Sequence, residues 1–276
     1  MHARPPAVAG RFYPGSAAEV AHEVAQLYAG AAGGDVRAAA VMCPHAGWVY
    51  SGKLAAATLA GVHVPERVVV LCPNHTGAGA RVAVMAEGAW QLPGAVVPID
   101  APLAHAILDE ARAVRGVRDD ARAHAGEHAI EVLLPLLLAR QPALRIVPIV
   151  VGGLDGDECV ALGQALARAV ARAGDGADVL VVASSDMSHY LPDGEARRRD
   201  RLALDALVTG DAGALVDAVV DHDVSMCGVR PAAAMLAYAR ARGAALPHLV
   251  GYATSGDAFG DYDRVVGYAG VVVPAA

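Results

Sequence analysis

Short apolar runs recur along the chain, and the segments between them have the spacing of amphipathic helices. The runs lie at residues 38–42, 67–72, 144–151 and 178–183, and proline, glycine or polar residues follow each of them closely. A strand that is apolar on both faces is typical of a parallel sheet that helices cover. The pattern therefore predicts an α/β fold with a mixed, mostly parallel sheet flanked by helices.

Helices are predicted between these strands. Ser16 and Glu19 have the spacing of a capping box, in which a hydroxyl and a carboxylate exchange hydrogen bonds with backbone N–H groups, and that helix ends near Gly30. The other helices are expected at residues 52–61, 100–113, 127–140, 157–173, 195–208, 212–219 and 231–242. Pro135 is expected to kink the third of these, because its ring clashes with the preceding turn.

Four further segments are predicted to be strands. Residues 81–87 alternate like a half-exposed strand, and residues 90–99 are expected to pair with them as an antiparallel edge. Residues 248–253 and 265–273 are expected to close the sheet. No internal repeat or linker interrupts the sequence, so residues 1–276 are expected to form a single domain.

Composition and charge exclude several classes of protein. Hydrophobic residues make up 55% and charged residues 18% of the chain, which argues against disorder. The net charge is −7, whereas a nucleic-acid partner needs a basic face. No apolar run reaches the ~18 residues of a membrane span. The four cysteines form no CxxC pair, which fits a reducing compartment. We therefore expect a cytoplasmic protein that binds neither nucleic acid nor membrane.

Histidines follow two of the predicted strands at the same relative position. His45 comes after the strand at residues 38–42, and His75 comes after the strand at residues 67–72. Ligands of open α/β sheets bind outside the carboxyl ends of the strands, so both histidines are expected to face one pocket. Neutral imidazole is a common ligand of zinc, iron and copper. A histidine after a strand also often satisfies loop backbone, and position alone leaves that alternative open.

Ionisable residues also follow the strand at residues 178–183. Asp186 and His189 lie three residues apart, so one could be a ligand and the other a general acid or base. Asp186 could equally cap a turn. His124 and His128 lie four residues apart, but their motif is not the H-E-x-x-H of zinc proteases. A role behind the ligands or facing the substrate is expected for His128.

Cys227 differs from the other cysteines because it lies in a predicted polar loop. A buried free cysteine usually behaves as a small hydrophobic residue, and this is expected for Cys43, Cys72 and Cys159. Sequence position alone does not decide between this role and a chemical one for Cys227.

Five motifs, with an opening VAGRFYPG at residues 8–15, resemble the Memo family in order and interval. They are CPHAGWVYSG (43–52), CPNHTG (72–77), GEHAIE (126–131), SSDMSHY (184–190) and MCGVRP (226–231). Each is short, but the series covers nearly the whole chain. Related bacterial and archaeal chains are often labelled as component B of a Memo and radical-SAM system, so the resemblance implies a functional link to a radical-SAM protein.

The resemblance implies a fold similar to that of the class III extradiol dioxygenases, which are non-haem iron enzymes. The metal-site positions of the Memo family fall on His45, His75 and Cys227. Asp186 and His189 match the remaining pocket residues and are expected to be catalytic, with His189 similar to the acid/base histidine of the dioxygenases.

The third ligand position departs from the dioxygenase pattern. Extradiol dioxygenases hold Fe(II) with two histidines and a carboxylate, whereas Cys227 stands in the third place here. A thiolate is softer than a carboxylate and favours Cu(I), zinc or redox-active iron. One transition metal ion is therefore expected, iron or copper first and zinc as the alternative. Cleavage of a catechol ring is not implied. His128, Trp48 and Tyr190 are expected to contact the substrate.

Three functions remain open from the sequence. The first is a metal-dependent redox enzyme, in which His189 transfers protons to or from oxygen or substrate. The second is a non-catalytic module that binds a peptide or a partner protein in the same cleft. The third is a hydrolase that uses zinc-activated water. The sequence identifies neither the substrate, a small molecule or a peptide, nor the oligomeric state.

Overall fold

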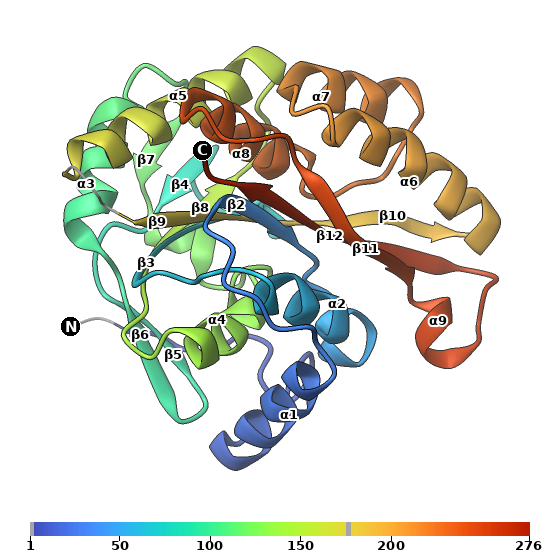
Figure 1. The fold of residues 1–276 in the computed structure, drawn as a ribbon. Helices are drawn as coiled ribbons and strands as arrows, with labels where there is room; N and C mark the ends of the chain where they lie inside the picture. The colour runs from blue at the N-terminus through green and yellow to red at the C-terminus, as the bar shows by residue number, and fades with distance from the viewer. Residues whose placement is uncertain (1–2, 175–177) are drawn as a thin grey trace.

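A mixed sheet forms the centre of the protein, and helices cover both of its faces (Figure 1). The computed structural model describes residues 3–174 and 178–276, and within them the sheet has nine strands. Their spatial order is β10 (Asp186–Leu191), β12 (Val265–Pro274), β2 (Ala38–Cys43), β9 (Val179–Ser184), β3 (Arg67–Pro73), β8 (Arg145–Val151), β4 (Val82–Val84) and β7 (Val117–Asp119), with β11 (His248–Thr254) paired to β12. The predicted α/β fold class is confirmed.

The four central strands, β2, β9, β3 and β8, are parallel to one another. Almost all of their residues are buried, because helices lie on both faces, and this accounts for their continuous apolar runs. The antiparallel neighbours lie outside this group, with β12 beside β2 and β4 beside β8. The carboxyl ends of the central strands therefore lie at one edge of the sheet.

Two groups of helices cover the sheet (Figure 1). One group contains α1 (Ala17–Ala29), α2 (Trp48–Ala60) and α4 (Leu134–Arg140), and the other contains α3 (Ala101–Glu110), α5 (Gly156–Arg172), α6 (Asp193–Leu207), α7 (Ala212–Asp221) and α8 (Val229–Ala241). A single turn, α9 (Gly256–Phe259), lies between β11 and β12. None of the helices in the described part of the chain combines the length and the apolar character that a membrane span requires.

Helices α5 and α8 pack closely because Gly163 of α5 has no side chain. A Cβ atom at this position would overlap the carbonyl oxygen of Ala234 and the Cβ of Ala237, both on α8. The backbones of the two helices therefore lie nearly in contact at this point.

The prediction for residues 81–99 was wrong in two respects. The strand β4 is shorter than expected and fully buried, and it pairs with β8 on one side and β7 on the other. Strands β5 (Ala89–Leu92) and β6 (Ala95–Pro98) form a hairpin with each other and do not pair with β4. This hairpin joins β1 (Ala3–Arg4) in a separate small sheet.

The prediction of one kinked helix at residues 127–140 was also wrong. Residues 127–130 form a turn, which is followed by the 3-10 helix Glu131–Leu133 and then by α4. Pro135 stands in the first turn of α4, where its missing N–H would have no partner within the helix, so it kinks nothing. The turn at residues 127–130 carries Glu127 and His128.

The ends of two predicted helices also differ in detail. Helix α2 begins at Trp48, four residues before the predicted start at residue 52. At α1, Ser16 caps the helix by accepting the N–H of Glu19, as expected. The Glu19 carboxylate, however, accepts the Ser16 hydroxyl at 2.7 Å, and this contact replaces the backbone half of a capping box.

Candidate metal centre

Two histidines meet at the carboxyl edge of the central strands. His45 follows β2 and His75 follows β3, and β9 lies between these parallel strands. The His45 and His75 ring centroids are 5.1 Å apart. His45 is buried, whereas 30% of the His75 side chain is exposed. The two rings therefore lie close together, and the pair contacts solvent on the His75 side.

Cys227 reaches the same point from the loop that precedes α8. Its Sγ lies 3.4 Å from Nε2 of His45 and accepts the backbone N–H of Asp186 at 3.3 Å. One potential ligand atom from each of His45, His75 and Cys227 lies within 4.8 Å of the other two. Three donors that are far apart in sequence thus come together from the loop after β2, the loop after β3 and the loop before α8.

Hydrogen bonds fix the orientation of the His45 ring. Nδ1 of His45 lies 2.8 Å from Oγ of Ser184, and the Ser184 hydroxyl donates to the carbonyl oxygen of Ala129 at 2.6 Å. Since that hydroxyl hydrogen is already used, Nδ1 of His45 must donate to Ser184. Nε2 then carries the lone pair and faces Cys227. This is the tautomer and orientation that a metal ligand needs.

Burial keeps His45 neutral. Desolvation, and next the nearby His75 and His128, hold the pKa of His45 well below its ordinary value. A neutral imidazole is the form that binds a metal ion.

The thiols of all four cysteines are protonated in the metal-free protein. Burial is the main cause that raises the pKa of each of them, and the Asp186 carboxylate raises that of Cys227 further. Cys43, Cys72 and Cys159 are fully buried, as expected for inert thiols, whereas Cys227 is partly accessible. Metal binding at Cys227 would therefore release a proton, because the thiolate is the ligand form.

Asp186 supports the pocket from its other side. Its Oδ1 accepts the backbone N–H of His45 at 2.8 Å, and its Oδ2 lies 3.9 Å from Nε2 of the same residue. Burial raises the pKa of Asp186 to about 6. The residue therefore holds the His45 loop and also places a carboxyl oxygen beside the candidate ligands.

His189 is anchored through one ring nitrogen. Nδ1 lies 2.9 Å from the carbonyl oxygen of Ser225, and its backbone N–H donates to the hydroxyl of the same serine. A carbonyl oxygen only accepts, so Nδ1 carries a hydrogen, and Nε2 has no hydrogen-bond partner among the described residues. The loop at residues 222–228 therefore positions both Cys227 and His189.

The three predicted substrate contacts occupy different environments. The His128 ring stacks on His75 with centroids 4.7 Å apart and is half-buried. Tyr190 is 65% exposed beside His189, with the positive φ of 60° that is rare for a bulky residue. Trp48 is buried and donates its indole N–H to the carbonyl oxygen of Val132, so it has no polar group left for a ligand.

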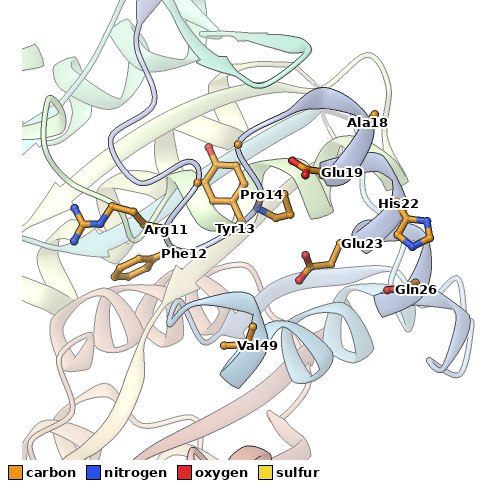
Figure 2. Close-up of a pocket in the computed structure, with 12 residues that line it drawn as sticks. Arg11, Phe12, Tyr13, Pro14, Ala18, Glu19, His22, Glu23, Gln26 and Val49 are labelled. Carbon is orange, nitrogen blue, oxygen red and sulfur yellow. The ribbon is translucent and has the colours of Figure 1, made fainter.

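A groove lies beside residues 10–15, near the N-terminus. It has a volume of about 740 Å³ and runs between residues 10–15, α1 and Val49 of α2. Figure 2 shows Arg11 and Phe12 at one end, with Glu23 and other polar side chains of α1 toward the opposite end. The Phe12 ring lines the groove and also packs edge-on against His128, with centroids 4.9 Å apart. Phe12 therefore stands between the groove and the histidines.

Several residues at this site were not identified from the sequence. Glu127 accepts hydrogen bonds from His75, and Ser184 does so from His45. Arg4 and Glu131 form a buried ion pair at 2.6 Å, which holds the N-terminal arm that contains Arg4 against the rest of the protein. Glu127, Glu131 and Ser184 all lie inside the motifs noted above. Charged residues within an otherwise apolar segment were the signal that could have identified the two glutamates.

The fold and the site together define a mixed α/β protein with a His/His/Cys cluster at the carboxyl edge of its parallel strands. The family model for Memo-like proteins matches residues 4–272. MEMO1 family proteins from Methanopyrus kandleri and Aquifex aeolicus are 39% and 38% identical to this chain, over 98% and 99% of both chains respectively. One from Methanothermobacter thermautotrophicus is 38% identical over 96% of this chain and 98% of its own. The protein belongs to the Memo family.

Proposed function

We propose that the protein binds one transition metal ion, iron or copper, through His45, His75 and Cys227 and acts as a metal-dependent oxidoreductase. The observation that carries this proposal is the convergence of the three donors. The lone pair of His45 Nε2 faces the Cys227 sulfur at 3.4 Å, and the third potential ligand atom, from His75, lies within 4.8 Å of both. Three donors around one point, with a side open to solvent, are the arrangement of a catalytic metal site.

The donor chemistry supports iron or copper over magnesium or calcium. Two imidazoles and a thiolate suit soft or borderline metals, whereas Mg²⁺ and Ca²⁺ prefer oxygen ligands. A bound iron or copper ion would supply one-electron chemistry at the open side of the cluster. Zinc fits the same donors and would favour a hydrolase instead, since zinc-bound water has a pKa of about 7.

His189 is proposed to move the proton. Its Nδ1–H is held by Ser225, so Nε2 is free to accept a proton from a bound substrate and to return it later. Asp186 would hold the His45 loop and, with a pKa of about 6, could share a proton with a bound group. His128 stacks on His75 and would orient the substrate against the cluster. Tyr190 would form part of the exposed rim.

Binding of a peptide or a partner protein is the second candidate function. It is favoured by the groove of about 740 Å³, which meets the histidine cluster at Phe12. A short extended segment in this groove would contact Phe12, which packs against His128, without any chemistry taking place.

The deciding experiment is metal analysis of anaerobically purified protein, followed by oxygen-uptake measurements with a panel of reductants. About one iron or copper ion per chain, together with oxygen uptake that His45→Ala abolishes, would support the oxidoreductase. Zinc at the same stoichiometry, without oxygen uptake, would favour the hydrolase. A protein that retains no transition metal even after anaerobic reconstitution would contradict the proposal and leave peptide binding.

A further inference from the structure

Glu127 is the most completely hydrogen-bonded carboxylate beside the cluster. It lies in the turn at residues 127–130 and is fully buried. Its Oε2 accepts the backbone N–H of His75 at 2.8 Å, and its Oε1 lies 2.9 Å from Nδ1 of the same residue. Oε1 also accepts the backbone N–H groups of His128 and Ala129. One carboxylate therefore holds both the backbone and the ring of His75.

We propose that Glu127 is the positioning residue of the metal centre, which fixes His75 in its Nδ1–H tautomer and leaves Nε2 as the ligand atom. This inference rests on the proposed metal-binding function and adds to it the residue that prepares the exposed histidine. A carboxylate behind a ligating histidine sets the orientation of the ring and makes the imidazole a stronger base.

Glu127 is well suited to remain an anion in this position. Three backbone N–H groups, which can only donate, point at its two oxygens. The carboxylate therefore accepts the Nδ1 hydrogen and does not donate one to it, which determines which nitrogen of His75 carries the proton.

The same hydrogen bonds argue against Glu127 as a metal ligand. His75, Glu127 and His128 also place potential donor atoms within 4.8 Å of one another. However, the Glu127 oxygens already accept four N–H groups. Turning the carboxylate toward a metal ion would leave these N–H groups without an acceptor, which is unfavourable because a buried donor without a partner is not compensated for its lost hydration. In the group of His75, Glu127 and His128, Glu127 therefore positions His75 and does not bind the metal ion itself.

The two candidate histidine ligands differ in their supports. His45 donates its Nδ1–H to the neutral hydroxyl of Ser184, whereas His75 donates to a carboxylate. His45 is buried and held by packing, while His75 is substantially exposed. The charged partner thus acts on the histidine whose ring has fewer neighbours to hold it.

The N-terminal arm holds Glu127 in place. The guanidinium of Arg4 donates to the backbone carbonyl oxygens of Glu127 and His124 at 2.6 and 2.5 Å. The guanidinium of Arg4 also forms the ion pair with Glu131 at 2.6 Å and stacks over the Trp90 ring. Arg4 therefore holds the chain at His124, before Glu127, and at Glu131, after it.

The test uses Glu127→Gln, with Glu131→Gln as a matched control four residues away. Glutamine keeps an acceptor oxygen for the three N–H groups that Oε1 accepts, but it replaces the charged carboxylate by a neutral amide whose NH₂ faces the backbone N–H of His75. The preference of His75 for the Nδ1–H tautomer should therefore weaken. Glu131 does not contact His75, so its variant should lose stability and keep the tautomer. Long-range ¹H–¹⁵N correlation spectra of metal-free protein identify the protonated nitrogen, with His75→Gln used to assign the signals.

The metal-free wild type should show His75 protonated at Nδ1, and Glu127→Gln should bind zinc about 10–100-fold more weakly in a chelator competition assay. An Nε2–H tautomer in the wild type would overturn the inference, and this measurement stands even if Glu127→Gln fails to fold. The same tautomer change in Glu131→Gln would also overturn it, since the fold of the turn and not the carboxylate would then set the ring. A wild type that binds no metal would refute the proposed function and leave the tautomer result as a separate finding.

Discussion

His124 gives the protein a specific sensitivity to acid. The residue ends the 3-10 helix Ala121–His124 and is fully buried. Its Nε2–H donates to the carbonyl oxygen of Ala83 at 3.1 Å, and its Nδ1 has no hydrogen-bond partner among the described residues. Burial lowers the pKa of His124 to about 4. The folded protein therefore resists protonation of this ring.

The sign and size of the effect follow from proton linkage. The unfolded chain binds a proton at His124 below its ordinary pKa of 6.5, whereas the folded protein does so only near about 4. The stability that the neutral ring contributes is therefore complete above pH 6.5 and is lost as the pH falls toward 4. With these two pKa values, the loss between about pH 7.5 and about pH 5 is about 2 kcal/mol.

His124→Gln tests this value, because the amide can still donate to Ala83 and does not titrate. Urea unfolding of the metal-free wild type and variant, measured at both pH values, gives the free energy of unfolding of each. On acidification, the free energy of unfolding of the wild type should fall by about 2 kcal/mol more than that of the variant. His45 and His128 also have lowered pKa values, but they are present in both proteins and cancel. Equal losses in the two proteins would refute the reasoning.

Three other variants test separate parts of the structure. Arg4→Met removes the cation from buried Glu131 and should lower the free energy of unfolding by about 3–5 kcal/mol in urea titrations, whereas a change below about 1 kcal/mol would contradict a buried pair. Gly163→Ala should cost about 1–3 kcal/mol by the same assay because of the contact with Ala234, and an unchanged value would mean that α5 and α8 are not so close. His189→Ala should retain the wild-type metal stoichiometry in elemental analysis, and loss of metal would make His189 a ligand.

The fold class followed from the apolar runs because the central strands are buried on both faces and carry their signal locally. The local signal failed where long-range contacts decide the structure. Strand β5 of the β5–β6 hairpin pairs with β1, whose buried Arg4 is anchored by Glu131, more than a hundred residues away. At residues 127–130, the Glu127 carboxylate accepts the backbone N–H groups of the next two residues and so replaces the expected first helical turn.

The candidate site, too, could be predicted from the sequence only in part. His45 and His75 could be paired from the sequence because each follows a parallel strand, and such strands end at one edge. Cys227 could be placed with them only through the family resemblance, because nothing local to its loop indicates where the loop folds. Glu127 was missed because its partner, His75, lies 52 residues earlier and only the folded chain brings them together.

The central claim is that His45, His75 and Cys227 bind one metal ion, and cobalt(II) substitution tests it most directly. Because the thiolate is the ligand form, cobalt-loaded wild type should show a thiolate-to-metal charge-transfer band in the near ultraviolet. Cys227→Ser should abolish this band, and Cys72→Ser, which changes a buried thiol outside the cluster, should leave it intact. A band that persists in Cys227→Ser, or its absence from the cobalt-loaded wild type, would contradict the account.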